Sequence, residues 1–145
     1  GKCRAECGYS FNAKCPRNRY RVTVYFPKPI KGIGSCVGFG SMTLDNIEQI
    51  VATALAGQLL GKQLIYLEAG SGAKKAVSID IIRAVKDQLH IPLIVGGGIC
   101  TPDAMIQAYQ AGADIVVIGN HFEQYPEEVP IFTDALKEYG IKHSN

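Results

Sequence analysis

Residues 64–72 read Leu-Ile-Tyr-Leu-Glu-Ala-Gly-Ser-Gly, an apolar run that ends in a glutamate and a glycine-rich turn. Two later segments also pass from an apolar run into a turn that contains glycine: Pro92 to Ile99 (Pro-Leu-Ile-Val-Gly-Gly-Gly-Ile) and Asp114 to Asn120 (Asp-Ile-Val-Val-Ile-Gly-Asn). Near-continuous apolar runs of this length are typical of parallel strands covered on both faces. The sequence therefore predicts three parallel strands, each followed at once by a turn.

A helical pattern precedes the first of these strands. Asp45 can cap the helix, with Glu48 three residues later as its capping-box partner. Gly61 is placed to end it. We expect one face of this helix to be buried, and its apolar residues at helical spacing are Ile47, Ile50, Val51, Ala54 and Leu55.

Two further helices are expected between the strands, and a last one follows them. Ser78 opens the second, whose buried face would be Ile81, Ile82, Val85 and Leu89. Thr101 caps the third, with Pro102 at its first position. Gly112 fits the end of that third helix. A C-terminal helix is predicted over Pro130 to Tyr139. Alternating strands and helices leave two architectures, an open doubly wound sheet or a barrel.

The first part of the chain differs from the rest. Residues 1–31 hold eight basic residues and one acid, Glu6. This arm is either an anion or nucleic-acid patch or a poorly structured segment; it carries no RNA-binding signature, and we expect no nucleic-acid partner. Arg21 to Phe26 favours a strand, and Lys31 to Gly40 a glycine-rich loop or an irregular strand. We therefore divide the chain into residues 1–41, a basic, cysteine-containing arm, and residues 42–145.

Composition limits the class of protein. The chain has 145 residues, 47% of them hydrophobic and 19% charged, which is ordinary for one globular domain. No apolar run approaches the roughly 20 residues that span a bilayer, and we expect a cytoplasmic protein without a secretory signal. Of the five cysteines, Cys3 and Cys7 form one loose pair and no second pair follows. We expect reduced thiols and assign no metal ligand.

The turns after the three strands carry the chemistry. Carboxyl ends of parallel strands are where α/β folds place their ligands. A glycine turn lets backbone N–H groups approach an anion closely, and the following helix N-terminus adds partial positive charge. Two such turns on adjacent strands make a cup for a phosphate. His121, close to the third turn, is expected to be a surface residue.

Two polar side chains of the first strand belong to the same site. Tyr66 and Glu68 alternate with Leu67, so they share one face of the strand, with Glu68 nearer its end. A carboxylate there can accept hydrogen bonds from substrate hydroxyls. General base is the second role open to Glu68.

The quoted segments are similar to the geranylgeranylglyceryl phosphate synthase family, which includes bacterial heptaprenylglyceryl phosphate synthases. The likeness runs from about Asp45 to Glu123 and includes Thr-Ala-Leu-Ala-Gly at residues 53–57. Its specific part is Tyr-Leu-Glu-Ala-Gly-Ser-Gly-Ala at residues 66–73. The resemblance implies a (β/α)₈ TIM barrel, which takes about 200 to 250 residues. Residues 42–145 would then be roughly its C-terminal half.

The resemblance also implies a prenyltransferase of ether-lipid and phospholipid biosynthesis. The C3 hydroxyl of sn-glycerol 1-phosphate attacks the allylic carbon of a polyprenyl diphosphate, and diphosphate leaves with the help of Mg²⁺. The lipid product implies work near a membrane surface. Carried over to this chain, the substrate-binding residues for the glycerol and the phosphate are Tyr66, Leu67, Glu68, Ala69, Gly70, Ser71, Gly72, Gly97, Gly98, Gly119 and Asn120, with Glu68 the catalytic candidate.

The departures from the family leave alternatives open. The family's metal-binding aspartate belongs to the first barrel strand, but no aspartate precedes Asp45 here, so the Mg²⁺ ligands are not identifiable. Residues 1–41 do not resemble the family, and whether the chain is active alone stays open. A phosphosugar isomerase or epimerase barrel is one alternative, although it needs an acid–base pair. A non-catalytic phosphate-binding half-barrel, paired as a homo-oligomer to cover its open edges, is the other.

Overall fold

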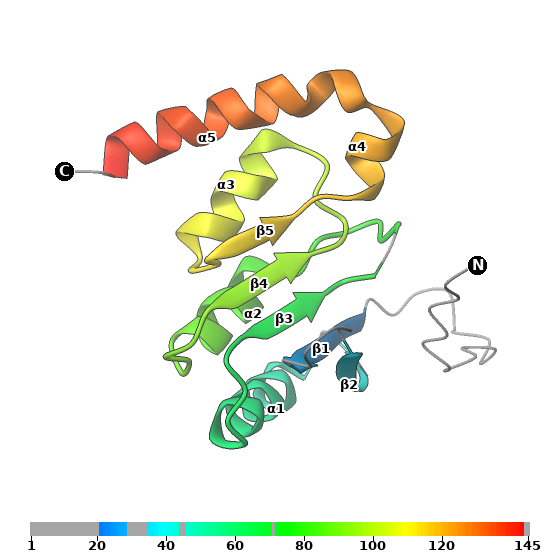
Figure 1. The fold of residues 1–145 in the computed structure, drawn as a ribbon, viewed down its shortest axis with the longest axis vertical. Helices are drawn as coiled ribbons and strands as arrows, with labels where there is room; N and C mark the ends of the chain where they lie inside the picture. Colours follow the sequence, from blue (N-terminus) through cyan, green and yellow to red (C-terminus); the bar gives the residue numbers. More distant parts are fainter. Residues whose placement is uncertain (1–20, 29–34, 44–45, 71, 144–145) are drawn as a thin grey trace.

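A computed structural model describes residues 21–28, 35–43, 46–70 and 72–143. Strands and helices alternate through most of this region (Figure 1). The elements, in chain order, are β1 (Arg21–Lys28), β2 (Ser35–Thr43), α1 (Ile47–Leu59), β3 (Ile65–Glu68), α2 (Ile79–Lys86), β4 (Leu93–Gly96), α3 (Pro102–Gln110), β5 (Ile115–Val117), α4 (Asn120–Gln124), the 3₁₀ turn η1 (Pro126–Glu128) and α5 (Val129–His143).

One five-stranded sheet, in the order β2-β1-β3-β4-β5, organises the fold. Strands β3, β4 and β5 are parallel, with Leu67 opposite Val95 and Val95 opposite Val116. Their arrowheads point the same way in Figure 1, so the three turns that follow them leave from one edge of the sheet. The three predicted parallel strands are confirmed, and with their helices they form part of a barrel.

The strands β1 and β2 form a hairpin, of which β1 runs against the direction of the parallel strands. β1 pairs antiparallel with both β2 and β3, with Thr23 opposite Glu68 and Tyr25 opposite Tyr66. The predicted strand over Arg21 to Phe26 is therefore confirmed. From Ser35 onward the irregular-strand alternative is the right one, because β2 pairs along its length and the register shifts between Val22 and Val24. Residues 31–34 lie outside the described residues.

The core lies between the parallel strands and the helices. Alternate residues of β3 and β4 are fully buried there, as the helix-facing side of a barrel strand requires. Burial of each such side chain stabilises the fold by about 1.5–3 kcal/mol. The expected buried face of α2 is confirmed. The cluster includes Ile65, Leu67, Leu93 and Val95 from the strands, Ile50 and Ala54 from α1, Ile81, Ile82 and Val85 from α2, Leu89 just after it, and Met105 and Ala108 from α3.

The opposite face of the parallel strands has far less cover. Tyr66, Ile94 and Ile115 are in register across β3, β4 and β5, as are Glu68, Gly96 and Val117. In a closed barrel this face would look inward. Here Ile115 is 46% exposed and Val117 is 41% exposed. The face that carries Tyr66 and Glu68 is therefore accessible.

Capping chemistry sets most helix ends as expected. Ser78 Oγ accepts the Ile81 N–H at 3.3 Å, and Thr101 Oγ1 accepts the Ala104 N–H at 3.2 Å. The expected cap of α1 was wrong by one residue. Asn46, not Asp45, is the N-cap, and its Oδ1 accepts the Gln49 N–H at 3.1 Å. Asp and Asn cap equally well, so sequence alone does not choose between neighbours.

Two further details of the helices bear on the predictions. Ile47 was expected on the buried face of α1 but is 36% exposed, because it is the first helical residue and projects beyond the core. Gly61 follows the C-cap of α1 with φ +78°, and Gly112 follows that of α3 with φ +109°. Both glycines thus occupy the predicted left-handed position after a helix.

The chain after β5 holds elements that the sequence pattern did not predict. α4 and η1 precede α5, which extends the predicted C-terminal helix at both ends. His121 was expected at the surface, but its side chain is only 11% exposed. It packs against Phe122, Tyr125 and Phe132, and its Nε2 lies 2.8 Å from Glu128 Oε2. His121 therefore joins α4 to η1 and α5.

Candidate functional site

Glu68, the last residue of β3, is held by two donors. The Tyr66 hydroxyl donates to Glu68 Oε2, and the Gly70 N–H donates to Glu68 Oε1 at 2.8 Å. Both side chains are half-buried on the accessible face of the sheet. Each oxygen of an ionised carboxylate can accept a second hydrogen bond. The carboxylate is thus fixed in orientation while its remaining lone pairs stay open to a ligand.

The turn after β3 meets the turn after β4 at Gly97 and Gly98. A Cβ placed on Gly97 would collide with Glu68 Oε1 and lie 2.8 Å from the Gly70 carbonyl oxygen. One placed on Gly98 would lie 2.5 Å from the Lys75 carbonyl carbon. Their φ angles are +81° and +71°, which side chains rarely adopt. Only glycine at both positions lets the two turns press together in this way.

The third turn reaches the first through Asn120. A Cβ placed on Gly72 would lie 3.7 Å from Asn120 Nδ2. Gly119 itself is exposed, with nothing within 4 Å of a Cβ placed there. All three turns that follow the parallel strands therefore converge at one edge of the sheet.

This edge offers backbone donors. Within the part of the chain that the structure describes, no hydrogen bond engages the N–H of Gly97 or of Gly98. Both residues are half-buried, so these donors are partly shielded from water. Successive N–H groups in a glycine turn form a concavity that suits an anion. The helix after Gly119 is only five residues long, so the expected contribution of its dipole is small.

The structure gathers most, but not all, of the predicted site residues. The Leu67 side chain is fully buried in the core on the opposite face of β3. Ala69 is half-buried and packs against that core, while its N–H donates to the Gly96 carbonyl at 2.9 Å. Ser71 lies outside the described residues. Gathered around the converging turns are Tyr66, Glu68, Gly70, Gly72, Gly97, Gly98 and Asn120.

Gly96 is a site residue that the sequence pattern did not predict. It is buried at the end of β4, directly opposite Glu68. A Cβ there would collide with the Tyr66 hydroxyl and lie 3.1 Å from Glu68 Oε2. The signal that could have found it is its register with Glu68, which requires the pairing of the strands to be known.

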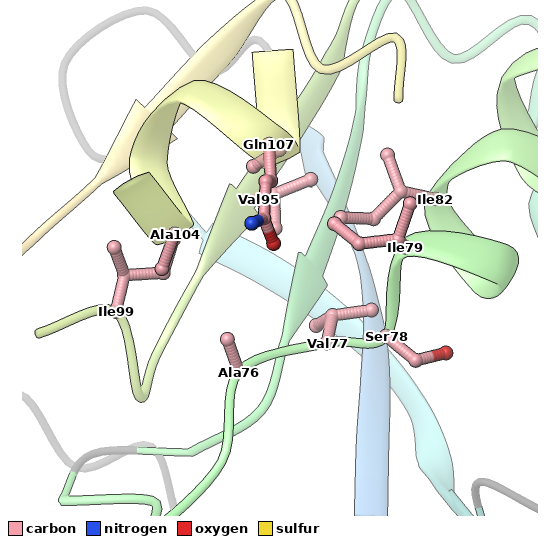
Figure 2. Close-up of a pocket in the computed structure, with 10 residues that line it drawn as sticks. Ala76, Val77, Ser78, Ile79, Ile82, Val95, Ile99, Ala104 and Gln107 are labelled. Atoms are coloured by element: carbon pink, nitrogen blue, oxygen red, sulfur yellow. The ribbon is translucent and has the colours of Figure 1, made fainter. Parts of the chain in front are cut away.

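A separate cavity of about 130 Å³ lies on the other side of β4 (Figure 2). Val95 lines it from the core face of the strand, with Ile99 from the second turn and Ile82 from α2. Figure 2 shows mostly aliphatic side chains around it, with Ser78 and Gln107 as its polar members. Because Tyr66 and Glu68 lie on the opposite face, this cavity is distinct from the site at the converging turns.

Among the residues in the described ranges, no group of three or more His, Cys, Asp or Glu side chains is placed to hold a metal ion. The protein ligands of the Mg²⁺ that the resemblance implies are therefore not identified among these residues. None of the helices in these ranges is long and apolar enough to cross a membrane.

Known proteins resemble this chain over much of its length. Geranylgeranylglyceryl phosphate synthase of Spirosoma linguale is 45% identical over 103 residues, which cover 70% of this chain and 41% of that protein. The enzyme of the same name from Zunongwangia profunda is 62% identical over 79 residues, or 54% of this chain and 34% of that protein. The chain thus spans less than half the length of these relatives.

Solved structures of enzymes with the same name also match part of this chain. (S)-3-O-geranylgeranylglyceryl phosphate synthase of Thermoplasma acidophilum, crystallised with sn-glycerol 1-phosphate, matches with a TM-score of 0.55 and 41% identity over 63% of this chain and 36% of that one. The Thermoplasma volcanium enzyme matches with a TM-score of 0.59 and 39% identity over 65% of this chain and 38% of that one. The profile of the PcrB family matches residues 30–138, and this chain therefore belongs to the PcrB family.

Proposed function

We propose that this chain carries the glycerol-phosphate site of a prenyltransferase that joins a polyprenyl diphosphate to sn-glycerol 1-phosphate. The observation that supports this most is the convergence of three strand-end turns beside an oriented carboxylate, Glu68. Relatives that bear the name of such an enzyme match this region, and one was crystallised with sn-glycerol 1-phosphate.

The two halves of glycerol 1-phosphate suit two parts of the site. We assign the phosphate to the N–H groups of Gly97 and Gly98, with Gly72, Gly119 and Asn120 completing the cup. The polyol would lie along Tyr66 and Glu68, whose carboxylate accepts hydrogen bonds from its hydroxyls.

The reaction that we assign forms one bond and breaks another. The C3 hydroxyl oxygen of glycerol 1-phosphate bonds to the allylic carbon of the prenyl chain, while the bond from that carbon to diphosphate breaks. Glu68 is the only carboxylate in the three turns and can take the hydroxyl proton.

The remaining assignments follow from this chemistry. The polyprenyl diphosphate and the lipid product call for a protein that works close to a membrane surface. We assign the cytoplasm as its compartment, in keeping with the exposed, free thiol of Cys100. A second copy of the chain, as a homo-oligomer, would cover the exposed residues Ile115 and Val117.

A second candidate function is phosphate binding without catalysis. Strand β1 lies antiparallel along β3, at the edge where the preceding parallel strand of a closed barrel would pair. Among the residues that the structure describes, no further strand is in place to line the far side of a prenyl groove. A phosphosugar isomerase would need an acid–base pair at the strand ends, and Glu68 alone does not supply one.

Binding of glycerol phosphate can be followed residue by residue. Amide resonances of the ¹⁵N-labelled chain are recorded while sn-glycerol 1-phosphate, its enantiomer and inorganic phosphate are added in turn. We expect the amide resonances of Gly97 and Gly98 to change their chemical shifts with all three ligands. We expect sn-glycerol 1-phosphate to bind most tightly. If these amides do not respond at millimolar ligand, the proposed site is wrong.

Catalysis is then tested separately. The chain is incubated with sn-glycerol 1-phosphate, geranylgeranyl diphosphate and Mg²⁺, and the ether product is sought by mass spectrometry. A Glu68→Gln variant is the matched control. Product from the unaltered chain alone supports the transferase, whereas phosphate binding without product supports the non-catalytic candidate.

A further inference from the structure

We propose that Gly96 is a positioning residue for the polyol half of the site. Its missing side chain creates the space in which the Tyr66 hydroxyl meets Glu68. The effect on ligand binding rests on the proposed function, but the steric relationship can be tested without any ligand.

The geometry around Gly96 leaves no room for one more carbon atom. A Cβ there would collide with the Tyr66 hydroxyl, lie 3.0 Å from Tyr66 Cε2 and lie 3.1 Å from Glu68 Oε2. The hydroxyl oxygen alone would be at a colliding distance, and the other two atoms would be tightly packed against the new methyl group. Gly96 is also buried, and β4 pairs with strands on both sides, so its backbone cannot move away easily.

Gly96 is a cleaner test position than its neighbour. Gly97 also faces Glu68, but its φ of +81° means that any side chain there strains the backbone as well. Gly96 lies in a strand and has no positive φ. A Gly96→Ala change therefore adds the steric conflict and little backbone strain.

The conflict would act on the carboxylate through the tyrosine. Tyr66 donates to Oε2, and Gly70 donates to Oε1. If the tyrosine hydroxyl is pushed aside, Oε2 loses its donor and the carboxylate can rotate. Its free lone pairs then no longer point in a fixed direction. The phosphate donors on Gly97 and Gly98 belong to the backbone and do not depend on this pair.

Gly96→Ala should therefore change the binding of two ligands differently. For Gly96→Ala we expect inorganic phosphate to bind as it does to the unaltered chain. Because a hydrogen bond to a charged group is lost, affinity for sn-glycerol 1-phosphate should fall by roughly 10- to 100-fold. If Gly96 had only a structural role, its replacement would lower the affinity for both ligands to a similar extent. Gly140→Ala is the matched control, since nothing lies within 4 Å of a Cβ placed there.

Removing the hydroxyl that the new methyl group strikes provides a rescue test. Tyr66→Phe alone should also lower the affinity for sn-glycerol 1-phosphate, because Glu68 Oε2 loses its donor. When Gly96→Ala is added, the further loss of affinity should be small, because the tyrosine oxygen that would collide is gone. Additive losses in the double variant, or unchanged 1-phosphate affinity in Gly96→Ala, would overturn the inference.

The same pair of variants remains informative if Gly96→Ala does not fold. In that case the Tyr66→Phe/Gly96→Ala chain should recover a cooperative thermal transition. Failure of both to fold would contradict the steric account. If the unaltered chain binds neither ligand, the proposed function fails, but the Gly70 amide resonance still reports on Glu68. The chemical shift of this amide should change in the Gly96→Ala variant and stay the same in the Gly140→Ala variant.

Discussion

Lys86 Nζ lies 2.7 Å from Asp114 Oδ2, and the same oxygen accepts the Leu93 N–H at 2.7 Å. One carboxylate thus joins the end of α2, the start of β4 and the residue before β5. Gly112 makes the approach possible, because a Cβ there would lie 2.6 Å from Lys86 Cγ. This connection lies at the opposite ends of β4 and β5 from the converging turns.

Asp114→Ala should destabilise the chain far more than Lys86→Met. The alanine removes the acceptor of the Leu93 N–H, and Leu93 is fully buried, so the loss should be about 1–3 kcal/mol. The methionine keeps the apolar stem of Lys86 and loses only a partly exposed ion pair, for about 0.5 kcal/mol. Urea unfolding followed by circular dichroism measures both. Equal losses would show that the ion pair, and not the backbone bond, is what counts.

Asn120→Ala should weaken the binding of inorganic phosphate. Asn120 lies close to Gly72 and belongs to the proposed phosphate cup, where its side-chain amide can donate to the phosphate. Loss of one hydrogen bond to the phosphate should lower affinity by roughly 3- to 10-fold. The measurement is a phosphate titration followed by amide shifts. Asn46→Ala, far along the chain at the start of α1, is the control and should leave phosphate affinity unchanged.

His121→Ala should reduce stability more than Glu128→Gln. The alanine empties a space bordered by Phe122, Tyr125 and Phe132, at a cost of about 2–4 kcal/mol. The glutamine keeps a hydrogen-bond acceptor for His121 and should cost under about 1 kcal/mol. Thermal unfolding of both variants makes the comparison. The reverse order would mean that the polar pair, and not the aromatic packing, holds α4 in place.

Thr101→Ala should cost about 1 kcal/mol through the loss of an N-cap. Thr101 Oγ1 accepts the Ala104 N–H at the start of α3, which follows the second turn directly. Thr101→Ser retains the acceptor oxygen and serves as the control. Chemical unfolding of the two variants should separate them by most of that amount. Identical stabilities would show that the cap contributes nothing to the fold.

Local chemistry explains why much of this fold is readable from sequence. Ser78 and Thr101 are caps with a clear following helix, and Gly61 allows a backbone conformation that few other residues adopt. The convergence of the turns follows from the parallel direction of the strands alone. Asn46 was missed because Asp45 beside it has the same capping chemistry.

Long-range pairing explains what the sequence did not reveal. The contact between Gly96 and Tyr66 depends on the register of β3 and β4, which no local pattern states. The pairing of Thr23 with Glu68 joins residues far apart in the chain. α4, with five residues, is too short to show a helical repeat.

The antiparallel pairing of β1 with β3 has a consequence for reassembly with any added barrel fragment. The backbone groups of Tyr66 and Glu68 that such a fragment needs are already bonded to Tyr25 and Thr23. The two pairings exclude each other, so an added fragment can pair with β3 only after the hairpin has detached. The rate of association would then be limited by the rate of detachment. It would reach a plateau as the concentration of the fragment rises.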